Sequence, residues 1–150
     1  MRIIIQRVQH ASVKVENNIT GKINHGLLVL VGFEPDDNKE DFEWISKKIV
    51  QLRIFGDDNG VMNLDIKQVN GEILVVSQFT LHAATKKGNR PSYIRASKPE
   101  EAKIQYNTFL NVLKNHIDSD IQTGIFGADM KVELLNDGPV TIFIDSRNKE

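Results

Sequence analysis

The fold is organised around the stretch Ile73-Leu74-Val75-Val76-Ser77-Gln78-Phe79-Thr80-Leu81. Its first four residues are apolar and mostly β-branched, which predicts a strand that is buried on both faces. The strand runs into Ser77-Gln78-Phe79-Thr80 without the glycine or proline of an ordinary turn. Polar side chains and free backbone N–H groups at the end of a buried strand are a common place for chemistry, so we expect a functional site there.

The chain before this strand is predicted to form further strands and one helix. Strands are expected at residues 2–8, 11–15, 19–25 and 27–33, with a hairpin turn at Asn17-Asn18 and a central position for the last strand. An amphipathic helix is expected at residues 38–53, where Asp37-x-x-Glu40 places acidic groups at the helix start. Residues 61–71 give no clear pattern.

The chain after residue 81 is predicted to hold a long loop, a helix and two strands. The loop covers residues 82–98 and ends in Ser97-Lys98-Pro99-Glu100, the pattern of a capping box at a helix start. Alternating apolar residues predict a strand at 130–134, and Asp137-Gly138 is a hairpin signal before a returning strand at 140–144. These elements predict one mixed α/β domain spanning residues 1–150, with its helices on one side.

The composition is that of a soluble globular protein of 150 residues, with 40% hydrophobic residues, 26% charged residues and a net charge of −1. The chain has no cysteine, which excludes disulfides, thiol nucleophiles and cysteine zinc sites. The longest apolar run, residues 26–33, is far shorter than the roughly 20 residues that span a membrane. Because no targeting segment is visible, we expect a cytoplasmic protein that does not bind membranes.

The residues able to act in catalysis form no complete constellation in the sequence. The four histidines share no metal-ligand spacing, so neither a metal site nor a cofactor is predicted. Ser77 and Thr80 are candidate nucleophiles, but no Gly-x-Ser-x-Gly elbow and no ordered base accompany them. The simpler interpretation is that both hydroxyls hydrogen-bond the backbone at the strand end.

Two further stretches carry both a structural and a functional interpretation. The loop 82–98 has no acidic residue, which favours contact with phosphate over a purely solvated role. Its basic residues are Lys86, Lys87, Arg90, Arg95 and Lys98. Gly138-Pro139 is either part of a hairpin turn or a cis peptide that points two carbonyl groups in an unusual direction, and the residues alone leave both interpretations open.

Two motifs taken together resemble the signatures of the D-aminoacyl-tRNA deacylase family. They are Ser77-Gln78-Phe79-Thr80-Leu81 and Asn136-Asp137-Gly138-Pro139-Val140-Thr141-Ile142, and the similarity covers essentially the whole chain. The resemblance implies a homodimer with a three-layer β/β/α architecture, in which β-sheets pack together and helices cover one face. It also implies chiral proofreading in translation, by hydrolysis of the ester between a D-amino acid, or mischarged glycine, and the 3′-terminal adenosine of tRNA.

The resemblance assigns the selectivity and the chemistry to particular residues. Gly138 and Pro139, joined by a cis bond and steadied by Arg7, would enter the pocket of the partner subunit and reject L-amino acids. Backbone N–H groups around Phe79 and Thr80 would bind the developing oxyanion of the ester.

The resemblance also assigns residues that hold the substrate. Ser77 and Gln78 would orient the pocket. Phe126 and Met130 would cradle the terminal adenine, although Met130 also fits the strand alternation and a role in the core. The tRNA contacts are expected from Lys86, Lys87 and Arg90 in the basic loop.

Three alternatives stay open at this point. The preferred mechanism uses water assisted by the terminal 2′-hydroxyl of the RNA, and a covalent mechanism through Thr80 ranks second because the sequence offers no base beside it. The substrate could instead be an L-alanyl or glycyl ester on the wrong tRNA. A protein of another class, a non-catalytic nucleic-acid-binding dimer that uses the loop 82–98, is the alternative to an enzyme.

Overall fold

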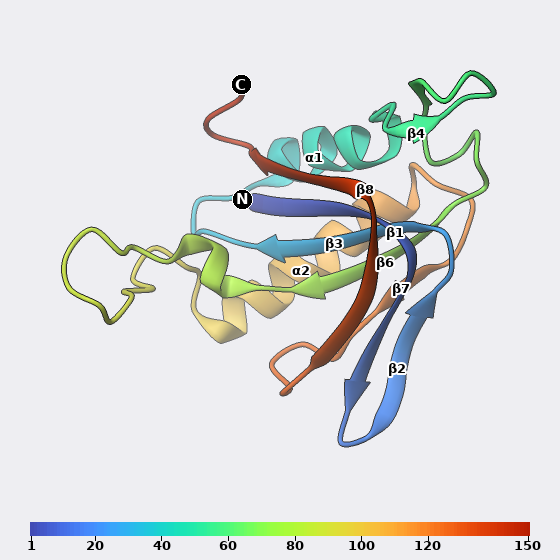
Figure 1. The fold of residues 1–150 in the computed structure, drawn as a ribbon. Helices are drawn as coiled ribbons and strands as arrows, with labels where there is room; N and C mark the ends of the chain where they lie inside the picture. The colour runs from blue at the N-terminus through green and yellow to red at the C-terminus, as the bar shows by residue number, and fades with distance from the viewer.

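The computed structural model describes residues 1–150 and shows a strongly bent β-sheet with its two α-helices on one side (Figure 1). The six-stranded sheet consists of β1 (Arg2–Val15), β2 (Asn18–Ile23), β3 (Gly26–Gly32), β6 (Glu72–Ser77), β7 (Ile121–Thr123) and β8 (Lys131–Asp145). A separate ribbon consists of β4 (Phe55–Gly56) and β5 (Met62–Leu64). The helices are α1 (Lys39–Gln51), α2 (Pro99–Lys114) and the short 3-10 helix η1 (Phe79–His82).

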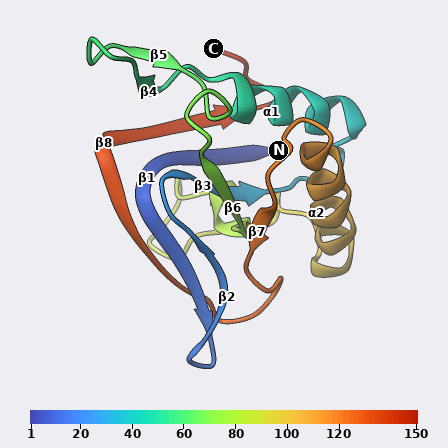
Figure 2. The ribbon, with the colours of Figure 1, turned by 90° about the vertical axis from the view of Figure 1, so that its right-hand side faces the viewer.

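The strands β1 and β8 are long enough to belong to two layers. The first half of β1 pairs with β3, from Arg2 opposite Gly32 to Val8 opposite Gly26, whereas its second half pairs with β2. On its other edge β1 pairs antiparallel with β8 along nearly its whole length. Figure 2 shows both strands curving together, so the sheet folds over on itself. The predicted strands 2–8 and 11–15 are therefore one continuous strand.

The strand β6 is the buried centre of this arrangement, as its sequence predicts. It runs parallel to β3 on one edge and to β7 on the other. Its residues 73–76 are each at most 2% exposed, because one face packs toward the helices and the other toward the second layer. The parallel approach of β3 requires a glycine at its start, since a Cβ atom on Gly26 would lie 1.9 Å from the carbonyl oxygen of Glu72.

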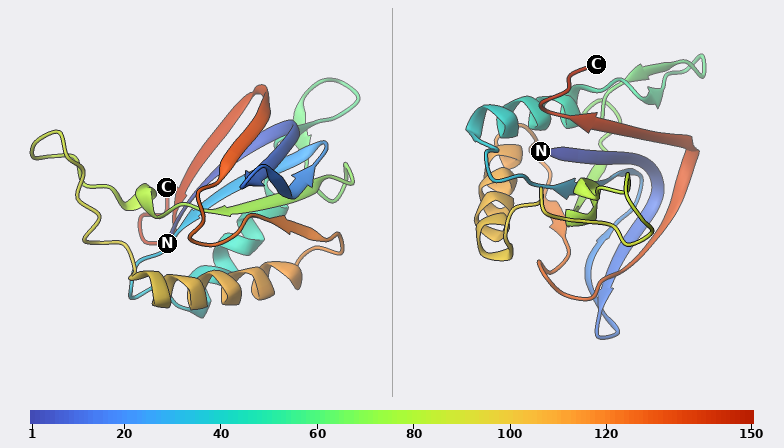
Figure 3. Two further views of the ribbon diagram at one scale, coloured as in Figure 1. Left: turned by 90° about the horizontal axis from the view of Figure 1, so that it is seen from below. Right: turned by 90° about the vertical axis from the view of Figure 1, so that its left-hand side faces the viewer.

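Two hydrophobic clusters separate three layers. The larger cluster of 21 buried residues lies between the sheet and the helices and includes Ile73, Val75, Phe42 and Phe109. The smaller cluster of seven residues, among them Leu74, lies between the two halves of the folded sheet. Figure 3 shows both helices on one side of the strands, so the predicted mixed α/β fold with a β/β/α layering is confirmed. Neither helix is long and apolar enough to cross a membrane.

The start of α1 is one residue later than the sequence pattern indicates. Asn38 is the N-cap residue: its side chain accepts a hydrogen bond from the Glu40 amide, and the Asp41 side chain accepts one from the Asn38 amide. The predicted capping pair of Asp37 and Glu40 is therefore wrong. The Asp37 carboxylate instead binds the α-amino group of Met1, with both groups fully buried.

The predicted capping box at the start of α2 is also wrong. The N-cap residue is Lys98, without a side-chain cap, and Pro99 occupies the first turn as expected. The Ser97 hydroxyl is buried and has no hydrogen-bond partner. The Ser97 amide donates to the carbonyl oxygen of Phe33 at 2.9 Å, which ties this residue to the end of β3 instead of the helix.

The Asp137-Gly138 signal does not form a hairpin. β8 is one strand that follows β1 past this point, because β1 offers a pairing partner on both sides of it. The pairing passes from Val8 opposite Asn136 to Gln6 opposite Thr141, which leaves residues 137–140 without partners in the ladder. We call residues 137–140 the β8 bulge. Gly138 has a φ of +114°, a conformation that favours glycine.

Candidate active site

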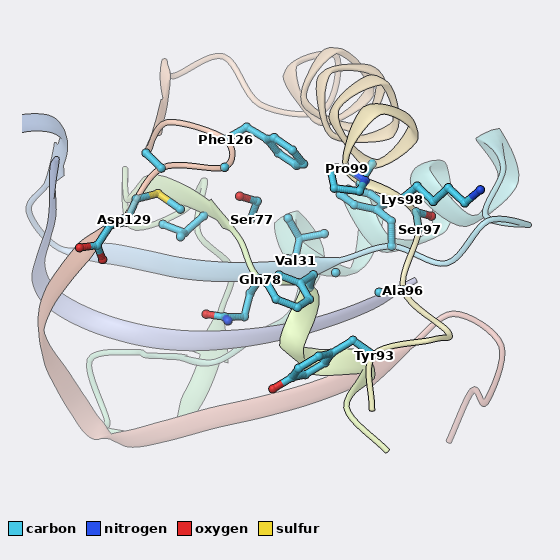
Figure 4. Close-up of a pocket in the computed structure, with 18 of the residues that line it drawn as sticks. Val31, Ser77, Gln78, Tyr93, Ala96, Ser97, Lys98, Pro99, Phe126 and Asp129 are labelled. Carbon is cyan, nitrogen blue, oxygen red and sulfur yellow. The ribbon is translucent and has the colours of Figure 1, made fainter. Parts of the chain in front are cut away.

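The end of β6 opens into a cleft of about 770 Å³, which is lined by the neighbouring strand β3, the start of α2 and the segment between β7 and β8 (Figure 4). Ser77, Gln78 and Phe79 line it at the end of β6, and Phe126 and Met130 line it from the segment between β7 and β8. The structure thus brings together five residues from two distant parts of the chain that the sequence singled out.

The backbone turns sharply at the end of β6. The Gln78 amide continues the pairing with β3 by donating to the carbonyl oxygen of Val31 at 2.7 Å. The chain then enters η1, in which the amide of Leu81 donates to Gln78 and the amide of Ala83 donates to Thr80. Phe79 and Thr80 supply the first N–H groups of this helical turn, and such groups have no acceptor within the turn. Phe79 lines the cleft and Thr80, the next residue, lies just outside its lining.

The hydroxyl groups at this turn have no base beside them. The side-chain nitrogen of Gln78 donates to Oγ1 of Thr80 at 2.5 Å, so the threonine oxygen acts as an acceptor. No titratable side chain makes a hydrogen bond to Ser77 or Thr80. The expectation that both hydroxyls bind neighbouring backbone is wrong, because the Thr80 partner is a side chain and the Ser77 hydroxyl makes no hydrogen bond within the chain.

Tyr106 of α2 supports the aromatic side of the cleft. The ring of Phe126 packs against Tyr106 of α2 with centroids 5.7 Å apart, and the Tyr106 hydroxyl donates to the carbonyl oxygen of Val75 at 2.9 Å. Burial raises the pKa of the Tyr106 hydroxyl well above its ordinary value, so the group stays a donor. Met130 lines the cleft and also packs on the smaller cluster, so both roles foreseen for it are compatible.

The last residue of η1 is a buried histidine. The His82 side chain is inaccessible to solvent, and its Nδ1 atom lies 3.4 Å from the carboxylate of Glu34. Burial lowers the pKa of His82 below 6.5, against the opposing influence of the Gly32 backbone and Glu34. Glu34 also contacts Arg95 at 3.2 Å, so it joins both ends of the basic loop to the end of β3.

The β8 bulge forms a second element that does not line the cleft. The peptide bond between Gly138 and Pro139 is cis, and both residues are exposed. Arg7 lies against this element: its Nε atom is 2.9 Å from the Asp137 carboxylate, and its Nη1 atom donates to the carbonyl oxygen of Ile54. The predicted neighbourhood of Arg7, Gly138 and Pro139 is thus present, on a different part of the chain's surface from Ser77 and Phe79.

Three of the five basic residues of the loop lie at its exposed tip. Ala84 and Ser92 pair through two backbone hydrogen bonds of 2.8 and 3.0 Å. This pairing closes residues 85–91 into a short loop of their own, which is the tip. Lys86, Lys87 and Arg90 all lie within this tip, exposed, and no carboxylate lies within 4.0 Å of their charged groups. No group of three or more His, Asp or Glu side chains in the structure is arranged to hold a metal ion.

Comparison with known proteins decides the family. The family model described as D-Tyr-tRNA(Tyr) deacylase matches residues 4–145. The chain belongs to this deacylase family. The resemblance carried by the two motifs is confirmed, and with it the assignment to the hydrolases. Proteins named D-aminoacyl-tRNA deacylase from Flavobacterium psychrophilum and Parabacteroides distasonis are 62% and 61% identical over the full length of both chains.

Solved structures agree with the deacylase fold. A structure named "c-Myc DNA Unwinding Element Binding Protein" matches with a TM-score of 0.91 and 39% identity, covering 97% of this chain and 98% of that one. A structure described as a probable eukaryotic D-amino acid tRNA deacylase matches with a TM-score of 0.81 over 95% and 97% of the two chains. At 15% identity, the second comparison speaks for the fold alone.

The sequence assigned no role to three residues that shape the candidate site. Tyr93 packs edge-on against Phe79, with ring centroids 5.0 Å apart. Asp137 anchors Arg7, and Glu34 joins the base of the loop to the core. Tyr93 lies in the loop 82–98, and nothing in the local sequence connects it to Phe79. The spacing of Asp137 and Arg7 likewise carries no signal, because their contact depends on strand pairing.

Proposed function

We propose that the chain hydrolyses the ester bond between a D-amino acid and the 3′-terminal adenosine of tRNA. The proposal rests chiefly on the N–H groups of Phe79 and Thr80 at the end of β6, next to a cleft that also has an aromatic and thioether side. Phe126 and Met130 offer stacking and apolar contact to an adenine base. An ester held on that side places its carbonyl group toward the η1 turn.

The proposed reaction is direct hydrolysis by water. The water oxygen forms a bond to the ester carbonyl carbon, the bond from that carbon to the 3′ oxygen breaks, and a proton ends on the 3′ oxygen. The Phe79 and Thr80 amides stabilise the negative charge on the carbonyl oxygen, and one such donor contributes about 10²- to 10³-fold in rate. The vicinal 2′-hydroxyl assists the water, since no titratable side chain makes a hydrogen bond to Ser77 or Thr80.

Chiral selectivity is assigned to the β8 bulge of a second copy of the chain. The proposed homodimer inserts Gly138 and Pro139 of one subunit into the cleft of the other, which gives two equivalent sites. Discrimination of mirror images by four powers of ten requires about 5.5 kcal/mol. A bulge held by Arg7 and Asp137 presents rigid backbone, which rejects an L side chain by steric exclusion while ignoring the identity of a D side chain.

The same steric exclusion leaves glycine as a second substrate. Glycine has no side chain on its α-carbon, so a wall that rejects L side chains does not reject it. We therefore include glycyl-tRNA in the proposed substrate range. The tip of the basic loop, with Lys86, Lys87 and Arg90, is assigned to the phosphate groups of the tRNA.

A non-catalytic nucleic-acid-binding protein is the second candidate, favoured by the unpaired cations of the basic loop and by the DNA binding named for the 39%-identical structure. The two functions separate in one experiment. D-tyrosyl-tRNA is incubated with roughly one-hundredth as much protein, a ratio at which a binder can occupy only a trace of it. Release of all the D-tyrosine supports the deacylase. Salt-sensitive retention of intact ester would overturn it.

A further inference from the structure

An exposed aromatic pair stands at the rim of the cleft, away from the side formed by Phe126. The rings of Phe79 and Tyr93 meet edge-on, with centroids 5.0 Å apart and planes at 74°. Phe79 is 55% exposed, Tyr93 is 38% exposed, and the adjacent Ile94 is 88% exposed. An edge-on contact leaves ring faces uncovered, so this rim offers flat apolar surface to a planar group.

The pair is held in place by the base of the basic loop. The backbone bridge between Ala84 and Ser92 immediately precedes Tyr93, and the Ala96 amide donates to the Tyr93 carbonyl oxygen at 3.0 Å. Arg95 is tied to Glu34 two residues further along the chain. Phe79 belongs to the η1 turn on the other side of the rim. A platform fixed in this way loses little conformational freedom when a ligand stacks on it.

Positive charge near the Phe79–Tyr93 pair indicates which kind of ligand would bind there. The loop tip that precedes Tyr93 carries Lys86, Lys87 and Arg90, none of them paired with a carboxylate. Aromatic rings beside a cationic segment are the combination that binds single-stranded nucleic acid, in which bases stack while phosphates meet the charges. In Figure 4, Phe126 and Tyr93 lie on opposite sides of the end of β6, so they form two separate aromatic positions in the cleft.

We propose that the Phe79–Tyr93 pair is a second base subsite, which stacks the nucleotide preceding the terminal adenosine of an unpaired RNA 3′ end. This inference rests on the proposed deacylase function, because the terminal adenosine must occupy the Phe126 side first. It adds a contact beyond the ester itself. The protein would therefore read two successive nucleotides of a single strand, by stacking and without regard to the identity of the second base.

The test compares esters that differ only in the length of the RNA. D-tyrosine is attached to adenosine, to the dinucleotide CpA and to the trinucleotide CpCpA, and kcat/KM is measured for each. The wild-type protein should prefer the CpA ester to the adenosine ester by about 5- to 150-fold, the range expected for stacking one base. The Tyr93→Ala variant should lose that preference, and Tyr93→Phe should keep it, because the ring and not the hydroxyl carries the contact.

The controls separate this inference from the underlying function. Ile104→Ala, which removes an exposed apolar side chain of α2 that does not line the cleft, should leave the preference unchanged. If the wild-type protein hydrolyses none of the three esters, the proposed function fails and the subsite fails with it. If it hydrolyses them and Tyr93→Ala lowers kcat/KM for the adenosine and CpA esters by the same factor, or for neither, only the second base subsite is overturned.

Discussion

Replacement of Gly138 by alanine tests whether the β8 bulge is held as tightly as its contacts indicate. Gly138 has a φ of +114°, and a Cβ atom there would lie 2.7 Å from Nη2 of Arg7. Arg7 has little freedom to retreat, because its side chain is only 13% exposed and binds both Asp137 and the Ile54 carbonyl group.

The magnitude has two parts. The backbone conformation costs about 1–3 kcal/mol for a residue with a side chain. Displacing Arg7 removes a charge-assisted hydrogen bond that contributes about 1.5–3 kcal/mol. Together they predict a loss of about 2.5–6 kcal/mol for Gly138→Ala. Gly60→Ala is the matched control, because Gly60 has a φ of +75° but no atom within 4 Å of the added Cβ, so only about 1–2 kcal/mol is expected.

Two measurements on the same samples check this reasoning. Urea unfolding of the two variants gives the difference in unfolding free energy, and deacylation of D- and L-tyrosyl-tRNA gives the selectivity. We expect Gly138→Ala to lose more stability than Gly60→Ala and to lose selectivity, whereas Gly60→Ala keeps it. If the two variants lose the same amount of unfolding free energy and Gly138→Ala keeps its selectivity, the idea that Arg7 fixes the bulge is refuted.

Two further predictions concern the η1 turn. Thr80→Ala should stay within about tenfold of wild-type kcat, because the hydroxyl only accepts a hydrogen bond from Gln78; complete loss of activity in a folded variant would instead point to a covalent threonine. The lowered pKa of His82 means that the unfolded chain binds a proton near pH 6.5 while the folded chain does not, so the free energy of unfolding should fall as the pH drops through this value. Urea unfolding of His82→Gln between about pH 7.5 and 5.5 should show a weaker dependence, and an unchanged one would exclude His82 as its source.

Patterns that depend on burial were readable from the sequence. The run 73–76 predicted β6 because a strand covered on both faces needs apolar residues at every position, and each is at most 2% exposed. The helical face with Phe42 and Ile45 predicted α1 for a similar reason. The motif at the end of β6 located the cleft, since its polar residues follow directly in the chain.

Features that depend on a distant partner were not readable. Asp137-Gly138 is a local hairpin signal, but β1 continues as a partner on both sides of it and keeps β8 running on through the bulge. The local sequence predicts Ser97 as an N-cap residue, yet its amide donates a hydrogen bond to the carbonyl oxygen of Phe33. The contact of Tyr93 with Phe79 depends on how the long loop folds back, which no short-range pattern encodes.

The central claim about this deacylase-family chain is that it removes D-amino acids from tRNA and leaves L-amino acids attached. The decisive experiment is the initial rate of deacylation of D-tyrosyl-tRNA beside L-tyrosyl-tRNA at a catalytic concentration of protein. We expect rapid loss of the D ester while the L ester persists. Loss of both esters at similar rates would contradict the selectivity assigned to Gly138 and Pro139, and loss of neither by a folded dimer would contradict the hydrolase itself.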